Sequence, residues 1–417
     1  MSVQNAPSHP PEAERLKLPE FVAMMGMLFA TVAVSIDGML PAMPEIAAEL
    51  APEAPNRAQL IIVFFVFGMG LGTLVAGPLS DSFGRKRIVL LGAGLYICGA
   101  LGAYYSTSIE AALAARLIQG LGAAGPRTVT IAMVRDLYSG RTMARILSFC
   151  MLIFTLFPAV APLLGAGIMA LAGWRAIFLA FVAFSVVSAA WLAFRQPETL
   201  PKELRRPLQP RVLYAGCLEI LANRQVMITT LVLALCFAML FATLVSVQPI
   251  FDVTFGRHEE FPYWFAGMAL VAGTGSILNA QLVERVGMRR LVVASLWVQL
   301  VSSAAMALVT FLGLLPVAIA FAVYLIWSTY VFFMAGLTMG NLNALAMEPM
   351  GHIAGLAASV VSSVATILGV LIAVPIGQAF DGTPLSAAAG VALSAAAALV
   401  LMMFNYAQPL RSPVTDL

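Results

Sequence analysis

The sequence predicts an all-α integral membrane protein, with twelve transmembrane helices arranged as two pseudo-symmetric six-helix bundles. Three observations support this prediction: an apolar composition, a series of long apolar segments, and a polar loop that recurs in each half. Hydrophobic residues make up 61% of the 417 residues and charged residues only 10%, and the mean hydropathy is +0.94. A soluble domain usually carries about 25% charged residues. The composition therefore indicates a polytopic membrane protein.

Twelve apolar segments are long enough to cross the hydrocarbon core of a bilayer, which takes about 20 helical residues. Six of them precede a polar stretch and six follow it. The predicted spans are 21–41, 59–79, 88–105, 111–134, 144–171, 176–194, 226–250, 263–283, 291–312, 315–342, 353–380 and 385–406.

The spans define five regions of the chain. Two tails flank two bundles, and the linker between the bundles is expected to contain a short amphipathic helix. The regions are an N-terminal tail (1–20), a first bundle (21–194), a linker (195–224), a second bundle (225–408) and a C-terminal tail (409–417).

The distribution of cations predicts the orientation of these spans. The first 20 residues lack the apolar core of a signal peptide, so the first span should be retained. If the N-terminus is cytoplasmic, most lysines and arginines fall in cytoplasmic segments, whereas the outer loops hold only Arg57, Arg175 and Arg257. Cytoplasmic loops of membrane proteins carry the excess of cations. We therefore expect both termini to be cytoplasmic.

One polar loop stands out between the second and third spans. Its sequence is Gly77-Pro78-Leu79-Ser80-Asp81-Ser82-Phe83-Gly84-Arg85-Lys86-Arg87. Glycine permits a tight turn and a close approach of two helices, while the acid and the three cations place opposite charges a few residues apart. The loop between spans eight and nine repeats the order of acid, glycine and final arginine in Glu284, Gly287 and Arg290.

These loops are candidates for a gate that closes one side of the protein. Charges that pair in one conformation and separate in another would bias a conformational equilibrium. The alternative is that the loop cations only maintain the orientation in the membrane. The candidate gate residues are Gly77, Asp81, Gly84, Arg85, Arg87, Asp136 and Glu198 in the first half, and Glu284, Arg290 and Glu348 in the second.

Three charged residues, Asp37, Arg116 and Arg127, lie well inside the spans. Such residues cost at least roughly 2.5–3.5 kcal/mol to insert, so they require a reason. Asp37 and Arg116 lie at similar depths from the outer ends of spans one and four. Arg116 could therefore control whether Asp37 holds a proton, or the two could form a static ion pair. Gln119, one turn from Arg116, is expected to line a cavity, whereas Arg127 is expected to extend toward the headgroups.

Further candidates lie in span five and in the second half. Pro158, Pro162 and Gly165 should bend span five and allow it to pack closely on a neighbour. Five polar or amphipathic residues inside apolar spans could face a substrate cavity, and the alternative for each is a packing or lipid-facing role. They are Gln248, Trp327, Tyr330, Asn341 and Asn343.

The sequence contains no recognisable site for a metal, a cofactor or a nucleic acid. The four cysteines and three histidines are scattered, without the spacing of a metal site. A phosphate-binding GxxxxGK[ST] loop is absent, which argues against ATP-driven transport. A membrane enzyme would need a cluster of nucleophile, base or metal ligands at one depth, and the predicted spans do not supply one.

The loop from Gly77 to Arg87 resembles the signature loop of the major facilitator superfamily. Several stretches resemble the bicyclomycin-resistance-type (Bcr/CflA) drug exporters: Ser35 to Pro44, Arg116 to Gly122 with Arg135-Asp136, and Gly340 to Pro349 followed by Gly351 to Gly355. Pro158, Pro162 and Gly165 are similar to the motif of facilitator antiporters, although Gly165-Ala166 replaces its double glycine.

This resemblance implies a proton-driven exporter of drugs or other small, largely apolar compounds. Asp37 would be the proton acceptor and Arg116 its modulator. The proton gradient would supply the energy without a cofactor, and the partners would be the substrate, protons and the lipid bilayer. The chain would be a multi-pass monomer of a bacterial inner membrane. The alternative function is proton-coupled import of a small metabolite.

Overall fold

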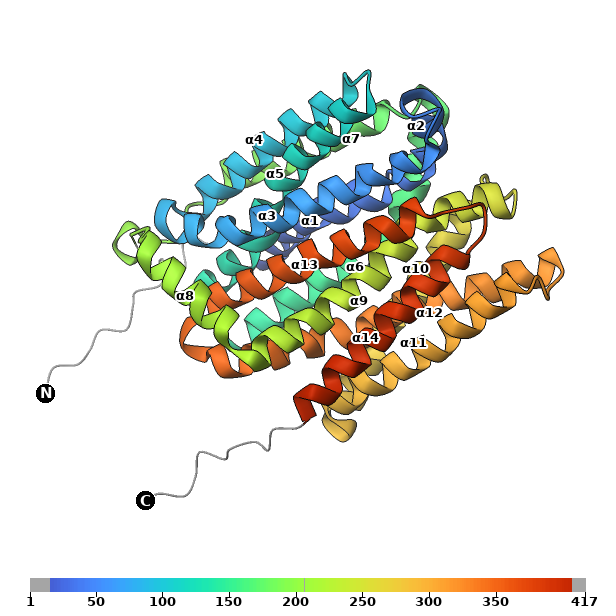
Figure 1. Ribbon diagram of the computed structural model, residues 1–417. Coiled ribbons are helices and arrows are strands. Elements are labelled where there is room, and N and C mark those ends of the chain that lie inside the picture. The colour runs from blue at the N-terminus through green and yellow to red at the C-terminus, as the bar shows by residue number, and fades with distance from the viewer. Residues whose placement is uncertain (1–15, 206, 407–417) are drawn as a thin grey trace, which may run out of the picture. The chain divides into compact units, whose positions relative to one another are not determined.

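The computed structural model describes residues 16–205 and 207–406, and every regular element in these residues is a helix (Figure 1). Residues 1–15 of the predicted N-terminal tail and the whole predicted C-terminal tail lie outside this part. The helices are α1 (Leu18–Asp37), η2 (Leu40–Ala42), α2 (Met43–Leu50), η3 (Pro55–Gln59), α3 (Leu60–Phe83), α4 (Arg85–Tyr104), α5 (Ile109–Leu137), α6 (Gly140–Ala172), α7 (Ala176–Arg195), η4 (Lys202–Leu204), α8 (Pro210–Ala222), α9 (Arg224–Pro249), η5 (Ile250–Thr254), α10 (Phe261–Val286), α11 (Met288–Phe311), α12 (Val317–Met347), η6 (Glu348–Ile353), α13 (Ala354–Gln378) and α14 (Leu385–Tyr406).

Each of the twelve predicted spans corresponds to one long helix, namely α1, α3 to α7 and α9 to α14. Nine stretches of described residues are long and apolar enough to cross a membrane, and the stretch Val317–Gln378 holds both α12 and α13. The helices α5, which carries three arginines, and α6, which contains two prolines, complete the twelve. The predicted all-α membrane fold is therefore confirmed, and the predicted linker contains α8.

Two glycines separate consecutive long helices at equivalent places in the two halves. Gly84 lies between α3 and α4 with a φ of 103°, and Gly287 lies between α10 and α11 with a φ of 88°. Residues with a side chain rarely adopt such positive φ angles, whereas glycine does so at little cost. The repeated glycine of the two loops therefore produces the same sharp turn twice.

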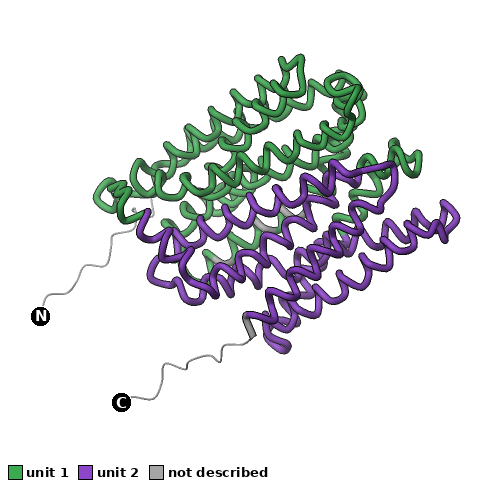
Figure 2. The backbone as a smooth tube through the Cα atoms, in the orientation of Figure 1, with its two compact units in different colours: residues 1–213, 248–270 green, residues 214–247, 271–417 purple. Residues whose placement is uncertain are grey.

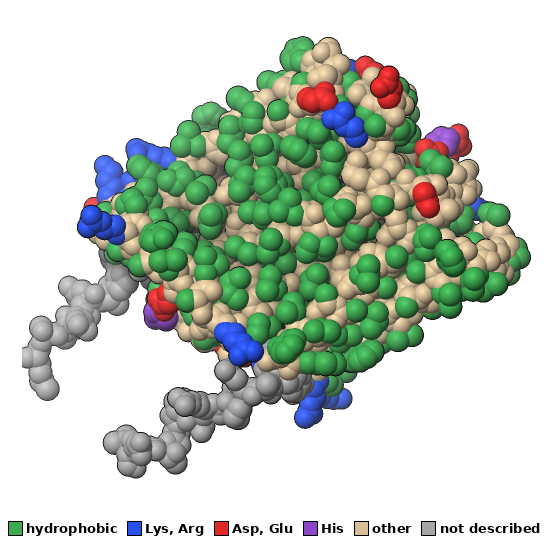
Figure 3. All heavy atoms as spheres, viewed as in Figure 1, with side chains coloured by type: hydrophobic (Ala, Val, Ile, Leu, Met, Phe, Trp, Pro, Cys, Tyr) green, Lys and Arg blue, Asp and Glu red, His purple; other side chains and the backbone are tan. Residues whose placement is uncertain are grey.

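The described chain forms two compact units (Figure 2). Unit 1 comprises residues 1–213 and 248–270, and unit 2 comprises residues 214–247 and 271–417. In unit 1, α5 packs against α3 and α4, and in unit 2, α11 packs against α12 and α14. On the face drawn in Figure 3, hydrophobic side chains cover the lengths of the helices and the charged side chains gather near helix ends, as a lipid environment requires.

Glycines bring α5 unusually close to its two neighbours in unit 1. A Cβ atom added to Gly120 would overlap the carbonyl oxygen of Phe65 in α3, and one added to Gly122 would overlap the backbone nitrogen of Tyr96 in α4. Small residues allow this backbone contact between membrane helices. The position of every side chain on α5, including Arg116, depends on it.

Replacing Gly120 with alanine should destabilise the protein, because the new methyl group would force α3 away from α5. We expect a loss of about 1–3 kcal/mol, the usual cost of overpacking, measured as a lower unfolding temperature of the purified protein in detergent. Gly94→Ala in α4 is the matched control, since a Cβ atom there meets nothing within 4 Å. Equal unfolding temperatures for the two variants would contradict the close contact between α3 and α5.

Candidate functional site

Asp37 is the last residue of α1, and it is only 6% exposed. No hydrogen bond or ion pair reaches its carboxylate from any residue that the structure describes. The end of α1 packs closely against α6. A Cβ atom added to Gly165 of α6 would overlap the carbonyl oxygen of Gly38, the residue after Asp37. Of the three predicted residues of span five, Gly165 therefore lies beside the neighbour of Asp37, while Pro158 and Pro162 lie within the length of α6.

Arg116 is completely buried in α5, and each of its three guanidinium nitrogens donates a hydrogen bond. Nε donates to the carbonyl oxygen of Ile61 in α3 at 3.1 Å, Nη2 to that of Ser35 in α1 at 3.0 Å, and Nη1 to Oε1 of Gln119 at 2.7 Å. The guanidinium carbon also lies 4.3 Å from the centre of the Phe65 ring, which is a cation–π contact. Arg116 therefore joins three helices of unit 1 through a single buried cation.

Asp37 and Arg116 do not form an ion pair in this structure, so the static pair considered from the sequence is not present. The reason is that the guanidinium donors are directed at backbone carbonyl groups and at Gln119. The two residues are connected instead through α1, since Ser35, which accepts from Arg116, lies two residues before Asp37. Gln119 is buried, and its Nε2 has no hydrogen-bond partner among the described residues; its place in a cavity stays a prediction.

Two hydroxyl groups near this site were not singled out from the sequence. The Ser35 hydroxyl is in hydrogen-bond contact with the Tyr96 hydroxyl, and both side chains are buried. Each is a polar residue within an apolar span, which was the available signal. Their contact joins α1 to α4, and the two residues are 61 positions apart in the sequence. The periodicity of a single helix does not reveal which residues of two distant helices come into contact.

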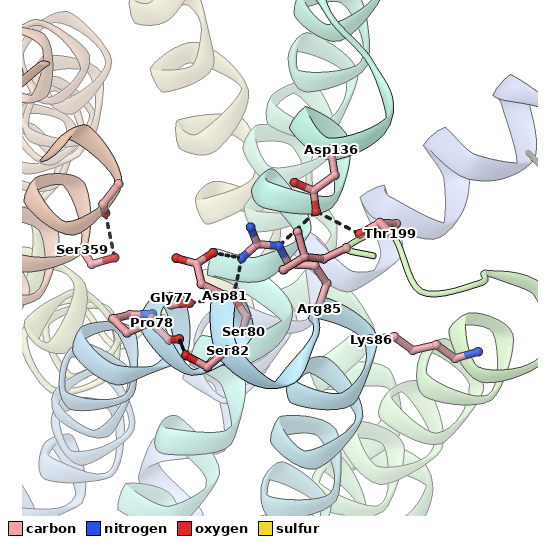
Figure 4. A network of polar contacts seen from close by, with 12 residues as sticks. Gly77, Pro78, Ser80, Asp81, Ser82, Arg85, Lys86, Asp136, Thr199 and Ser359 are labelled. Atoms are coloured by element: carbon pink, nitrogen blue, oxygen red, sulfur yellow. Dashed lines mark hydrogen bonds and ion pairs between the residues drawn. The ribbon is translucent and has the colours of Figure 1, made fainter. Parts of the chain in front are cut away.

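The charges of the first polar loop are joined by Arg85 (Figure 4). The Arg85 guanidinium forms ion pairs with Asp81 at 2.5 Å and with Asp136 at 3.0 Å, and it donates to the Ser80 hydroxyl at 2.7 Å. Thr199, in the linker, donates its hydroxyl to the same Asp136 oxygen at 3.0 Å. The structure thus brings together three of the predicted gate residues and adds Ser80 and Thr199. We call this set the Arg85 network.

Glu198 caps the N-terminus of α4. Its Oε1 accepts hydrogen bonds from the backbone N–H groups of Arg85 at 2.9 Å and Lys86 at 3.4 Å. A carboxylate at this position satisfies donors that lack partners within the helix and interacts favourably with the helix dipole. A Cβ atom on Gly84 would overlap the same carboxylate, so the small size of Gly84 is needed as well as its positive φ.

Two further residues of the predicted gate lie outside the Arg85 network. Arg87 is exposed, and it makes no ion pair within the part of the chain that the structure describes. Gly77 contributes its carbonyl oxygen, which accepts a hydrogen bond from Ser80 at 2.8 Å.

No ion pair joins the predicted gate residues of the second half to one another in the described residues, so their role in a gate stays a prediction. Glu284, Arg290 and Glu348 are all exposed, and no ion pair joins them in the described residues. The residue that follows the turning glycine is Arg85 in the first loop but Met288 in the second. The second loop therefore has no arginine at the position that Arg85 occupies in the first.

Two of the predicted cavity residues of the second half make hydrogen bonds to α11. The indole nitrogen of Trp327 donates to the Ser303 hydroxyl at 2.9 Å, and the Tyr330 hydroxyl donates to the carbonyl oxygen of Ser295 at 3.2 Å. Gln299 donates to the same Ser303 hydroxyl at 2.8 Å. These bonds use the polar groups of α12 within unit 2, which favours the packing alternative for Trp327 and Tyr330.

The remaining predicted cavity residues differ in their surroundings. Asn341 donates from Nδ2 to Oδ1 of Asn279 in α10 at 2.7 Å, whereas Asn343 donates to a carbonyl oxygen of its own helix. Gln248 is buried near the end of α9. Arg127 is half-buried, and its Nη1 lies 3.5 Å from the sulfur atom of Met69.

No group of three or more His, Cys, Asp or Glu residues among those described could hold a metal ion. The buried charged residues in the same part of the chain are Asp37, Arg85 and Arg116, and all three belong to unit 1. Unit 1 therefore contains one buried carboxyl group, at the end of α1, and a buried guanidinium group that donates to backbone oxygens of α1 and α3.

Comparison with known proteins shows the family to which this chain belongs. The model of the Major Facilitator Superfamily matches residues 23–374. A bicyclomycin resistance protein homolog from Haemophilus influenzae is 29% identical over 392 residues, which cover 93% of this chain and 95% of that protein. The multidrug resistance protein MdtL from Escherichia coli is 31% identical over 246 residues, 58% of this chain and 61% of that protein. Among solved structures, a D-xylose–proton symporter matches with a TM-score of 0.72 at 13% identity, over 91% of this chain and 97% of that one.

Removing the cap of α4 should destabilise the loop end of unit 1. We expect Glu198→Ala to cost about 0.5–2 kcal/mol, as the loss of an N-terminal cap usually does, because two backbone N–H groups lose their acceptor. The unfolding temperature of the purified protein measures this cost. Glu203→Ala, an exposed acid of the same linker, is the control, and an equal effect of both substitutions would refute the capping role.

Proposed function

This chain belongs to the Major Facilitator Superfamily, and we propose that it is a proton-coupled secondary transporter that exports drugs or other small, largely apolar compounds by alternating access. The observation that carries the proposal is the buried carboxyl group of Asp37, which has no hydrogen bond or ion pair from the described residues. An ionised carboxylate in such a place is costly, whereas the protonated form is not. Asp37 should therefore be protonated while it is buried and should release its proton when it becomes accessible to water.

The relatives support export of drugs in particular. The Haemophilus influenzae relative is named for bicyclomycin resistance and the Escherichia coli relative for multidrug resistance. The first of these aligns over nearly the whole length of both chains. The described residues of unit 2 contain no buried charge, which suits apolar cargo better than a strongly charged metabolite.

Arg116 supports proton coupling by positioning Asp37. Its guanidinium holds the Ser35 carbonyl, and with it the end of α1 at which Asp37 lies. A shift of α1 relative to α3 and α5 would stretch or break these hydrogen bonds. A change in conformation would thereby alter the distance from Asp37 to the cation, and hence the tendency of the carboxyl group to release its proton.

The Arg85 network supports a conformational gate in unit 1. Arg85 connects α4 to α3 through Asp81 and to α5 through Asp136, and Thr199 adds the linker. Exposed ion pairs are worth about 0–1 kcal/mol each, and Arg85 is largely buried. Several such contacts formed together are sufficient to favour one conformation over another.

The cations of the loops support an orientation with both termini in the cytoplasm. The protein is a multi-pass bacterial membrane protein, and we expect it to act as a monomer in the inner membrane. Proton-coupled import of a small metabolite is the competing function. The names of the relatives favour export.

Uptake into inverted membrane vesicles distinguishes these functions. The interior of such a vesicle corresponds to the outside of the cell, so an exporter accumulates its cargo when the interior is acidified. We expect accumulation of labelled bicyclomycin, or of another compound from a panel of drugs and metabolites, that disappears when the gradient is collapsed. Accumulation of a metabolite only in right-side-out vesicles would overturn the proposal.

Replacing Asp37 with asparagine should abolish proton-driven transport. The amide keeps the size of the side chain but cannot carry a proton across the pH range of the gradient. We expect normal amounts of folded protein in the membrane and a loss of gradient-driven accumulation to the level of empty vesicles. Glu53→Gln, an exposed acid in the connection between α1 and α3, is the control, and undiminished pH-driven transport by Asp37→Asn would contradict the mechanism.

A further inference from the structure

Two asparagine amides of unit 2 are hydrogen-bonded to each other between α10 and α12. Nδ2 of Asn341 in α12 donates to Oδ1 of Asn279 in α10 at 2.7 Å, and it also donates to the carbonyl oxygen of Leu337 at 2.8 Å. A carbonyl oxygen can only accept, so the bond to Leu337 fixes which end of the Asn341 amide is the nitrogen. Asn279 must then present its oxygen to that nitrogen. We call these two side chains the asparagine pair.

The asparagine pair has one unused donor group and one unused acceptor. Within the part of the chain that the structure describes, Nδ2 of Asn279 and Oδ1 of Asn341 have no hydrogen-bond partner. Both atoms reach the accessible surface, since neither is among the fully enclosed polar atoms that lack a partner. They lie on either side of the single 2.7 Å bond that joins the two amides. The pair therefore offers an N–H group and a carbonyl oxygen close together.

Open space lies beside the asparagine pair. A Cβ atom added to Gly336 of α12 would overlap the backbone nitrogen of Ser276 in α10, so the two backbones touch at this level. Gly340 is one turn later on the same face of α12. It is exposed, and a Cβ atom added there would meet nothing within 4 Å. The helices therefore separate between these two glycines, and Asn341 directly follows the open position.

The asparagine pair also lies well within the two helices. Asn341 is six residues before the end of α12 at Met347, and Asn279 is seven residues before the end of α10 at Val286. At 1.5 Å per residue, both are about 9–10 Å from these helix ends. Polar groups at such a depth in a membrane helix have no bulk water to satisfy them. The unused donor and acceptor therefore require a partner.

A simpler role is that the asparagine pair only joins the two helices, as polar side chains often do in membranes. One interhelical bond would account for the 2.7 Å contact. It would account neither for the unused N–H and carbonyl groups nor for the open space at Gly340. Both of these features are those of a binding site, which needs room and a small number of placed polar groups.

We propose that the asparagine pair binds the amide group of a cyclic amide, such as a lactam, among the exported compounds. In a lactam the ring holds the C=O and N–H groups on the same side, so one edge of the molecule carries an acceptor beside a donor. The lactam oxygen accepts from Nδ2 of Asn279, and the lactam N–H donates to Oδ1 of Asn341. The ring occupies the open space at Gly340. This inference rests on the proposed function and names a substrate class for it.

Binding of a matched pair of lactams to the purified full-length protein tests the proposal. The probes are 4-phenylpyrrolidin-2-one and its N-methyl derivative, which has no N–H group to donate. Titration followed by saturation-transfer NMR gives the Kd of each. We expect the N-methyl derivative to bind at least about tenfold more weakly to the native protein, because Oδ1 of Asn341 is then covered without receiving a hydrogen bond.

Three variants locate this preference. In Asn341→Ala the acceptor is lost, so the two lactams should bind with equal affinity. In Gly340→Leu the new side chain fills the open space, and both lactams should bind at least about tenfold more weakly; this variant also serves if Asn341→Ala does not fold. Gln281→Ala is the control, because Gln281 is an exposed amide of α10 two residues beyond Asn279, and it should keep the native ratio of affinities.

Equal affinities of the two lactams for the native protein, or failure of both to bind, would overturn the proposal. A lower unfolding temperature of Asn341→Ala with an unchanged ratio of affinities would also overturn it, because the pair would then only join the helices. These measurements need no proton gradient. Their failure would leave gradient-driven accumulation in inverted vesicles unaffected, whereas absence of that accumulation for every compound would overturn the proposed function itself.

Discussion

The Arg116 guanidinium, buried without an acidic partner and bonded to backbone oxygens of α1 and α3, is the constraint to which the rest of unit 1 is adapted. A cation in this position requires that its donors all be satisfied. The glycines that bring α5 against α3 and α4 make this possible, because they reduce the separation of the backbones. The hydrogen bonds of the buried Arg116 therefore depend on the close packing of α5 at its glycines.

This arrangement gives Asp37 an environment that depends on the relative positions of helices. The carboxyl group has no partner of its own among the described residues, and the buried Arg116 guanidinium donates to the backbone of α1 two residues before Asp37. Movement of α1 would change the electrostatic environment of Asp37 without breaking an ion pair. In the proposed mechanism, this single titratable group would couple a protonation state to a conformation.

The two halves share the same backbone turn between consecutive helices but differ in the charged side chains that follow it. Both contain a glycine with positive φ between consecutive long helices, yet only the first loop follows it with an arginine that reaches two acids. In unit 2 the buried polar groups of the described residues are neutral; most donate to a carbonyl of their own helix, and a few, such as Trp327 to Ser303, bond between helices. The described structure therefore concentrates its ionic contacts in unit 1, where proton coupling and gating are proposed.

The twelve long helices, their boundaries to within a few residues and the unusual buried charges all follow from the sequence, because hydrophobic length and the cost of intramembrane charge are local properties of the chain. The partners of those charges do not. Arg116 bonds to carbonyl groups of Ser35 and Ile61, and any residue type offers such a carbonyl, so no side-chain pattern could reveal it. The repeated loop likewise predicted a gate in each half, but the second loop has Met288 where the first has Arg85, and only the folded structure shows that Arg85 pairs with two acids.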